Sequence, residues 1–169
     1  LHPATLRSWL VGTTYGRGSR RRHFEPVIRP AQTQGQIFLS FINLVEAHVL
    51  SAIRRTHNIP LQRMRPIIER LKKEAGNDHP LATVKLAAMG KELFLDSPDS
   101  PLVSLSHADQ TAMREVLAAY LCLIECDEQG LPIRLYPFSS TSDYKVENDR
   151  RPIVINPQGA YGKPVLRGT

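Results

Sequence analysis

Apolar residues at helical spacing open the chain. Leu6, Trp9 and Leu10 fall at positions i, i+3 and i+4, which predicts a short helix with these three side chains on its buried face. Pro3 suits the first turn of this helix. Three glycines within residues 12–18 then predict a hairpin instead of more helix. A short helix followed by a glycine-rich basic hairpin is the order of a winged helix-turn-helix that has lost its first helix.

Two longer amphipathic helices are predicted next, over residues 35–55 and 61–74. Pro66 interrupts the pattern of the latter helix, because proline lacks the amide that a helix interior needs. This helix therefore either begins late, near Arg63, or kinks. The apolar stripe of the 35–55 helix consists of Phe38, Phe41, Ile42, Val45, Val49 and Ile53.

The second half of the chain mixes helices with short strands. We expect helices over 81–88 and 108–125, strands over 92–96, 102–105 and 133–138, and a turn over 127–130. A strand, a turn and a second strand follow in the tail, and they must pair with something because two strands alone are marginally stable.

These elements predict an α+β fold in four parts. An incomplete winged helix-turn-helix spans residues 1–30, and a mostly helical body with a few strands spans residues 31–138. A polar linker follows over residues 139–151. A truncated β-hairpin tail over residues 152–169 begins a C-terminal domain. The chain opens inside a helical pattern and stops in an unfinished one, so we expect residues to be missing at both ends.

Charge is unevenly placed along this chain, whose net charge is +6 and whose pI is about 9.6. Residues 1–30 hold six basic side chains and one acidic side chain, and residues 150–169 hold four basic side chains and no acid. Residues 101–149 hold eight acids and three basic side chains. This distribution predicts separate surfaces for separate partners, with nucleic acid at the basic front.

Arginines in the predicted hairpin are the strongest candidates for DNA contacts. A run of three guanidiniums on a hairpin can reach backbone phosphates and release their counterions, although such a run can also be a solvated surface. On the preceding helix, Arg7 is the best candidate for a bidentate contact with guanine. The predicted DNA-binding residues are Thr5, Arg7, Ser8, Arg17, Arg20, Arg21 and Arg22. Residues 62–65 form a further basic segment, which we expect to be a solvated helix surface.

The sequence gives little support to an enzyme, a metal site or a membrane protein. Glu125, Asp127 and Glu128 have no converging histidine or metal ligand, and no nucleophile, phosphate-loop or dinucleotide motif is present. Cys122 and Cys126 lie four apart on a predicted helix and are expected to be reduced thiols of a cytoplasmic protein. No cofactor is expected, and residues 37–50 are too short and too polar to cross a bilayer.

Several segments resemble VapB-type antitoxins of type II toxin–antitoxin pairs. Residues 162–169 (GKPVLRGT) match the signature of a small bacterial antitoxin domain, and Thr5, Leu6, Arg7 and Trp9 resemble the second helix of MerR-like winged helices. Between them, residues 41–48 (FINLVEAH) and 79–81 (HPL) resemble the body of these antitoxins. Further carriers are the helix start at 62–65, Gly90, Leu93, Phe94, Gln110 and residues 134–138.

This resemblance implies an antitoxin that blocks a VapC-type toxin, a metal-dependent ribonuclease with a PIN fold, and represses the operon they share. The basic tail makes Lys163 and Arg167 candidates for toxin contact. A homodimer is expected because operators are pseudo-palindromic, and the 35–55 helix could supply its interface. The alternative is a free-standing MerR-like regulator whose body senses a ligand, and an enzyme ranks last.

Overall fold

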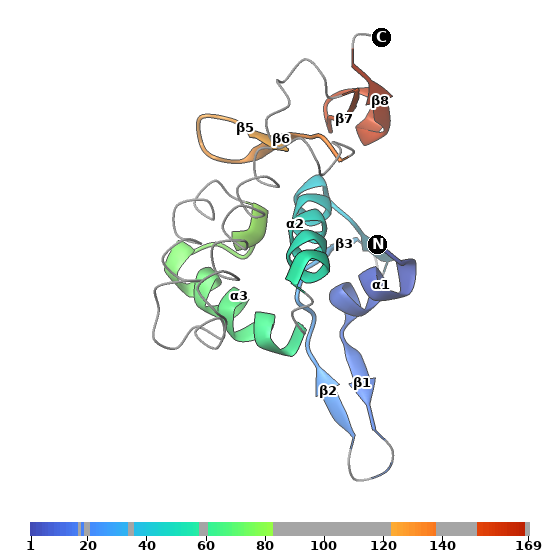
Figure 1. The fold of residues 1–169 in the computed structure, drawn as a ribbon, viewed down its shortest axis with the longest axis vertical. Coiled ribbons are helices and arrows are strands. Elements are labelled where there is room, and N and C mark those ends of the chain that lie inside the picture. The colour runs from blue at the N-terminus through green and yellow to red at the C-terminus, as the bar shows by residue number, and fades with distance from the viewer. Residues whose placement is uncertain are drawn as a thin grey trace.

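The protein is described by a computed structural model over residues 1–16, 18, 21–33, 36–57, 61–82, 123–137 and 152–167. Its central element is the helix α2, which has α1 on one side and α3 on the other (Figure 1). A β-hairpin extends beyond one end of α2, and a sheet covers the other end. The helices are α1 (Pro3–Val11), α2 (Phe41–His57) and α3 (Leu61–Ala75), with short 3-10 turns η2 (Pro80–Ala82) and η4 (Ala160–Gly162).

In the part of the chain that the structure describes, eight short strands pair only antiparallel. β1 (Thr13–Tyr15) pairs with β2 (Arg22–Phe24), and β3 (Ala31–Thr33) pairs with β4 (Gln36–Phe38). The remaining strands form one sheet in the order β5-β6-β7-β8. Their bounds are β5 (Ile124–Cys126), β6 (Pro132–Leu135), β7 (Ile153–Ile155) and β8 (Pro164–Leu166).

The short helix α1 has the predicted position and buried face. Pro3 occupies its first turn, and the His2 ring nitrogen Nδ1 accepts a hydrogen bond from the amide of Ala4 at 3.2 Å. Trp9 and Leu10 are buried in the main core, and Leu6 packs against it. The periodicity of the first ten residues was therefore sufficient to orient this helix.

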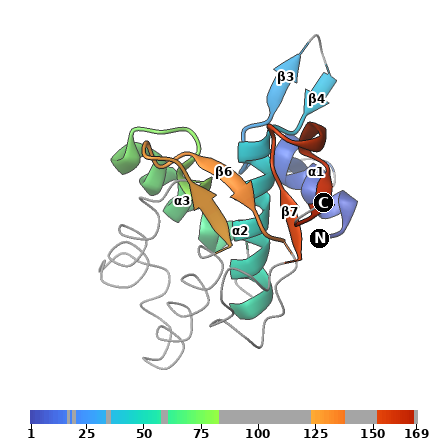
Figure 2. The same cartoon turned by 90° about the horizontal axis from the view of Figure 1, so that it is seen from above.

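The long helix begins six residues later than predicted. Residues 36–38 form β4, and Phe38 is exposed there instead of joining the stripe of α2. The signal that was missed is Ser40, whose hydroxyl oxygen accepts the amide of Asn43 at 3.1 Å, as an N-cap serine does. β4 also keeps its side chains exposed, and Figure 2 shows the β3–β4 hairpin projecting from the body.

Helix α2 is buried on most of its circumference, which explains its apolar composition. Val49, Leu50 and Ile53 belong to the main core, which α1 and α3 complete from opposite sides. From α3, a stripe at i, i+4 and i+7 enters this core, namely Met64, Ile68 and Leu71. The helix α3 starts at Leu61 and continues through Pro66, so the predicted late start near Arg63 is wrong.

The tail strands β7 and β8 form a hairpin, and β7 also pairs with β6 of the body through Leu135 and Ile155. These two residues pack with Val45 of α2 and Ala82 of η2 in a second cluster. The sheet thus connects residues on both sides of the predicted linker, and β6 supplies the pairing that the tail hairpin needed.

The structure corrects one further helix boundary. Glu125 and Cys126 lie in strand β5, so the predicted helix does not extend to residue 125, and Cys126 is a half-buried free thiol on a strand. Of the same predicted helix, Leu123 lies in a turn and Ile124 begins β5. Residues 108–122, which include Cys122, the predicted strands at 92–96 and 102–105, and residues 83–88 lie outside the described residues.

Candidate nucleic-acid interface

The outer face of α1 carries the residues predicted to read DNA. Because Trp9 and Leu10 point into the core, Arg7 projects outward and is exposed, while Thr5 and Ser8 are half-buried. The Ser8 hydroxyl donates to the carbonyl oxygen of Thr5 at 2.8 Å. Its proton is therefore engaged within the helix, and its oxygen remains as an acceptor.

The β1–β2 hairpin follows α1 directly and presents two of the predicted arginines. Arg21 and Arg22 are exposed, whereas Arg17 and Arg20 lie outside the described residues. Across the strands, the rings of Tyr15 and Phe24 meet edge to face with centroids 5.7 Å apart. This aromatic pair stabilises a ribbon that is otherwise largely exposed.

Two connections fix the hairpin to α1. Gly12 ends the helix with a φ of +80°, and its amide donates to the Ser8 carbonyl oxygen at 3.1 Å. After the hairpin, the amides of Val27 and Ile28 both donate to the carbonyl oxygen of Trp9, at 2.8 and 3.1 Å. Arg7, Arg21 and Arg22 are thus carried by one unit, in which the hairpin is bonded to the helix on both sides.

A cleft of about 490 Å³ lies between this hairpin and the start of α3. Of the predicted DNA-binding residues, Ser8 and Arg22 line it. The sequence patterns did not single out Arg54 and marked Arg65 only as part of a solvated helix face, yet both line the cleft beside Arg22. Its other lining residues are Thr13, Tyr15, Gly16, Phe24, Leu61 and Gln62.

Arg65 is held in place by the hairpin. Its guanidinium donates to the backbone carbonyl of Glu25 and lies over the ring of Phe24, 5.5 Å from the ring centroid. Burial lowers the pKa of Arg65, and the negative charges of Glu25 and Glu69 partly oppose this shift. The arginine therefore stays charged at neutral pH in a position fixed by two contacts.

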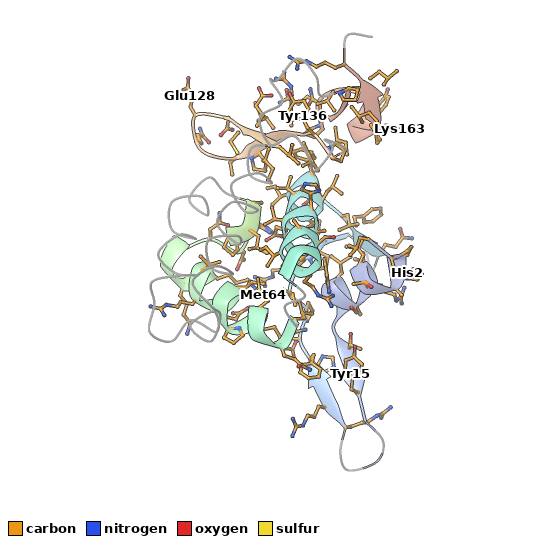
Figure 3. The ribbon with its side chains drawn as sticks, viewed as in Figure 1. His2, Tyr15, Met64, Glu128, Tyr136 and Lys163 are labelled. Atoms are coloured by element: carbon orange, nitrogen blue, oxygen red, sulfur yellow. The ribbon has the colours of Figure 1, made fainter. Side chains whose placement is uncertain are left out.

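The candidates for toxin contact lie at the far end of the molecule from the hairpin. Lys163 and Arg167 are exposed on the sheet that covers the opposite end of α2. Figure 3 shows Tyr15 of the hairpin and Lys163 at opposite ends of the long axis. The amide of Arg167 donates to the Pro152 carbonyl oxygen at 2.8 Å, which closes the β7–β8 hairpin.

The acidic residues near the sheet have structural partners. Arg134 and the Tyr136 hydroxyl donate to the two carboxylate oxygens of Glu125, at 2.7 and 2.9 Å. Partial burial raises the pKa of Glu125, but these hydrogen bonds and the charges of Arg134 and Arg167 outweigh it, so the net shift is downward. The Asp127 side chain accepts hydrogen bonds from the backbone amides of Gln129 and Leu131. These contacts give both carboxylates a structural role.

A buried polar network was not foreseen from the sequence. His79 Nδ1 lies 3.0 Å from the Glu46 carboxylate, and the Asn43 amide nitrogen donates to the same oxygen at 3.4 Å. Burial raises the pKa of Glu46, while its hydrogen bond with His79 pulls the pKa down. The network links two segments of the antitoxin resemblance, residues 41–48 and 79–81.

The residues that the structure describes contain neither a candidate metal site nor a membrane-spanning helix. No group of three or more His, Cys, Asp or Glu side chains there could hold a metal ion. Within the same residues, no helix is long and apolar enough to cross a membrane.

Comparison with known proteins shows that the front of the chain is similar to a DNA-binding family. Residues 1–68 match the family described as "Putative DNA-binding HTH domain". The matched segment contains α1, the β1–β2 hairpin, α2 and the first half of α3. It also contains every residue that lines the cleft.

One relative by sequence and one solved structure, both from Mycobacterium tuberculosis (strain ATCC 25618 / H37Rv for the relative), resemble nearly the whole chain. The protein named "Putative antitoxin VapB45" is 29% identical over 184 aligned residues, which cover 98% of this chain and 71% of that protein. The crystal structure of Rv2018 is similar in fold, with a TM-score of 0.58 and 24% identity over 98% of this chain and 72% of that chain. The resemblance to VapB-type antitoxins with a helix-turn-helix front is therefore confirmed.

Proposed function

From this resemblance to VapB-type antitoxins, we propose that the chain neutralises a cognate VapC-type PIN-domain ribonuclease and binds operator DNA to repress its own operon. The observation that carries the proposal is the separation of two basic surfaces by the length of α2. A helix of 17 residues spans about 25 Å. DNA at the hairpin end therefore leaves the sheet end accessible to a protein.

The DNA-reading surface in this proposal is the outer face of α1 with the hairpin. Arg7 meets base edges in the major groove, and Thr5 and Ser8 contact the groove beside it. The hairpin arginines Arg17, Arg20, Arg21 and Arg22 contact phosphates on the flanking backbone. The winged arrangement is supported by the order of α1 and the hairpin and by the HTH match over residues 1–68.

The toxin-binding surface in this proposal is the tail, where Lys163 and Arg167 approach the acidic metal-binding site of the ribonuclease. The negative charge of Glu125 near Arg167 reduces the positive charge of this surface. The protein acts as a homodimer in the cytoplasm, so that two copies of α1 reach the two halves of an operator. Because α2 is buried within one chain, it no longer suits the dimer interface suggested by its apolar stripe.

The decisive experiment is co-expression of the chain with a neighbouring PIN-domain gene. We expect the two proteins to copurify, and we expect the chain to suppress the ribonuclease activity of the partner. Charge reversal of both tail residues, Lys163→Glu with Arg167→Glu, should weaken copurification, whereas the control Lys73→Glu on α3 should not. A chain that binds operator DNA but leaves every such nuclease active is instead a free-standing MerR-like regulator.

DNA binding is tested by fluorescence anisotropy with the region upstream of the gene and with a scrambled duplex of equal length. Arg7→Ala should cost about 1–3 kcal/mol on the upstream region alone. Replacing Arg20, Arg21 and Arg22 by Ala should weaken binding to both duplexes and reduce the salt slope by about 0.9 per lost phosphate contact. If Arg7→Ala loses the same affinity for both duplexes, Arg7 contacts only the DNA backbone.

A further inference from the structure

The cleft between the hairpin and α3 is lined by residues of α1, both hairpin strands, α2 and α3. Ser8 comes from α1, Arg22 from β2, Arg54 from the last turns of α2 and Arg65 from α3. Its volume of about 490 Å³ falls within the range of about 300–1,000 Å³ seen for pockets that hold small organic groups. It is therefore large enough for a phosphate with the sugars attached to it.

The charge of the cleft is of one sign. Among the described residues, three guanidiniums line it and no carboxylate does. A neighbouring hollow of about 400 Å³ on the other side of Arg65 contains Glu25 and Glu69 among its lining residues. An anion is therefore attracted to the first cleft and repelled from the second, although the two share Arg65 and Phe24.

Arg54 is positioned by an aromatic ring, and one of its N–H donors has no acceptor among the described residues. Its guanidinium lies over the Trp9 ring, 5.7 Å from the centroid, which fixes its plane. Its Nε atom is buried and has no hydrogen-bond partner among the described residues. A buried N–H without an acceptor is costly and uncommon in folded proteins, so an external acceptor at this place would stabilise the arrangement.

Arg65 is also prepared for an external acceptor. The described residues give its guanidinium one hydrogen bond, to the Glu25 carbonyl, and its stacking on Phe24 holds the group in place. Since a guanidinium has five N–H donors, several remain for a ligand. Oriented guanidiniums bind phosphate oxygens through paired N–H···O bonds.

The cleft is continuous with the surface proposed to bind DNA. Ser8 and Arg22 belong to both, and the side chain of Tyr15, 60% exposed, stands at the same wall. We propose that a phosphodiester of bound DNA enters this cleft, so that Arg54 and Arg65 extend the DNA interface from the hairpin to α2 and α3. This inference rests on the proposed function, because it assigns these arginines to the same DNA-binding event.

Such a contact strengthens binding without reading sequence. The lining residues meet phosphate and sugar, which every duplex presents in the same way. Arg54 and Arg65 should thus contribute equally to operator and unrelated DNA, in contrast to Arg7. They should also contribute to the salt dependence of binding.

The test uses the full chain and the variants Arg54→Gln, Arg65→Gln and the double variant, with Lys73→Gln as a control that removes an exposed charge from α3 outside the cleft. Anisotropy titrations with the upstream duplex and the scrambled duplex are repeated at several salt concentrations. We expect each cleft variant to weaken binding to both duplexes by the same factor and to reduce the salt slope by up to about 0.9. The control variant should differ from the wild type in affinity and salt slope by only a small fraction of the change seen in the cleft variants.

Two further variants separate charge from fold. Arg54→Lys and Arg65→Lys keep the positive charge but lose the planar fork, so we expect them to retain most of the salt slope with reduced affinity. All variants are compared by thermal unfolding. A variant that has lost its fold is replaced in the comparison by its lysine counterpart, which leaves the packing of the aliphatic stem in place.

The outcomes are distinguishable. If Arg7→Ala and the hairpin variant weaken DNA binding while the cleft variants match the wild type, the proposed DNA binding stands and this inference is overturned. If the wild-type chain binds neither duplex, both fail together. If calorimetry shows AMP bound much more tightly than inorganic phosphate, with loss in the double variant and unchanged duplex binding, the cleft is a nucleotide site and the inference is overturned.

Discussion

The Asn43 side chain bonds three backbone groups, and its removal tests how the segment after the hairpin is held on α2. Its side-chain nitrogen donates to the Arg29 carbonyl oxygen at 2.7 Å. Its side-chain oxygen accepts the amides of Ala31 at 3.3 Å and Ser40 at 3.1 Å. Asn43 itself is 0% exposed, so Asn43→Ala leaves one carbonyl and two amides without these partners in a poorly hydrated place.

The magnitude follows from those three hydrogen bonds. Each contributes about 1 kcal/mol, and the cost rises toward about 3 kcal/mol for a group that stays buried and unpaired. We therefore expect the free energy of unfolding to fall by about 3 kcal/mol, a large part of the roughly 5–15 kcal/mol that stabilises a domain. At a urea dependence of about 2 kcal/mol per molar, the midpoint should fall by about 1.5 M.

Equilibrium unfolding in urea, followed by circular dichroism, measures this change. The matched control is Gln158→Ala, an exposed amide in the β7–β8 loop, which should stay within about 0.5 kcal/mol of the wild type. Asn43→Asp keeps the acceptor oxygen but loses the donor and places a second carboxylate beside Glu46. A loss below about 1 kcal/mol for Asn43→Ala would refute the reasoning, because the backbone groups would then find other partners at little cost.

Three further substitutions test other parts of the fold. Gly12→Ala should lower the free energy of unfolding by more than about 1 kcal/mol, because Gly12 has a φ of +80° and an added Cβ would overlap the Phe24 carbonyl oxygen. In the control Gly159→Ala, the added Cβ meets only ordinary contacts. An equal loss of stability in this control would contradict the explanation. Glu46→Gln serves as a reference for the pH dependence of stability. Burial raises the folded-state pKa of Glu46 above its ordinary value of 4.5, so the native state of the wild type holds the proton more tightly than the unfolded state. The stability of the wild type relative to this variant should therefore fall as pH rises from about 4.5 through the raised pKa, and urea unfolding at several pH values showing the opposite trend would be inconsistent with a desolvated carboxylate. Trp9→Ala should cost about 3–5 kcal/mol in thermal unfolding, since Trp9 is 1% exposed and fills the core between α1 and α2; a small effect would mean that the site collapses around the smaller side chain.

The sequence by itself determined those elements whose cause is local. The spacing of Leu6, Trp9 and Leu10 orients α1 because a helix repeats every 3.6 residues. The glycines after it predict the β1–β2 hairpin because they adopt positive φ at its ends, as Gly12 and Gly16 do. Basic composition at the front, together with the motifs of the antitoxin resemblance, was sufficient to indicate DNA binding.

Tertiary structure decided everything that depends on residues far apart in the chain. The start of α2, by contrast, was misplaced for a local reason: residues 36–38 fit a helical stripe, but they pair with residues 31–33 and Ser40 then caps the helix. The tail became part of one sheet with the body because Leu135 pairs with Ile155, a contact that no local pattern predicts.

The candidate site shows the same division. Arg7, Arg21 and Arg22 were visible in the sequence because they are close to one another and to the helix that presents them. Arg54 and Arg65 were not, since a basic residue on a helix is usually solvated, and only the packing of α2 and α3 against the hairpin brings their guanidiniums into one cleft with Arg22. Periodicity fixes which way a side chain points from its own helix, whereas the partner that it faces is fixed by the burial of apolar surface between distant segments.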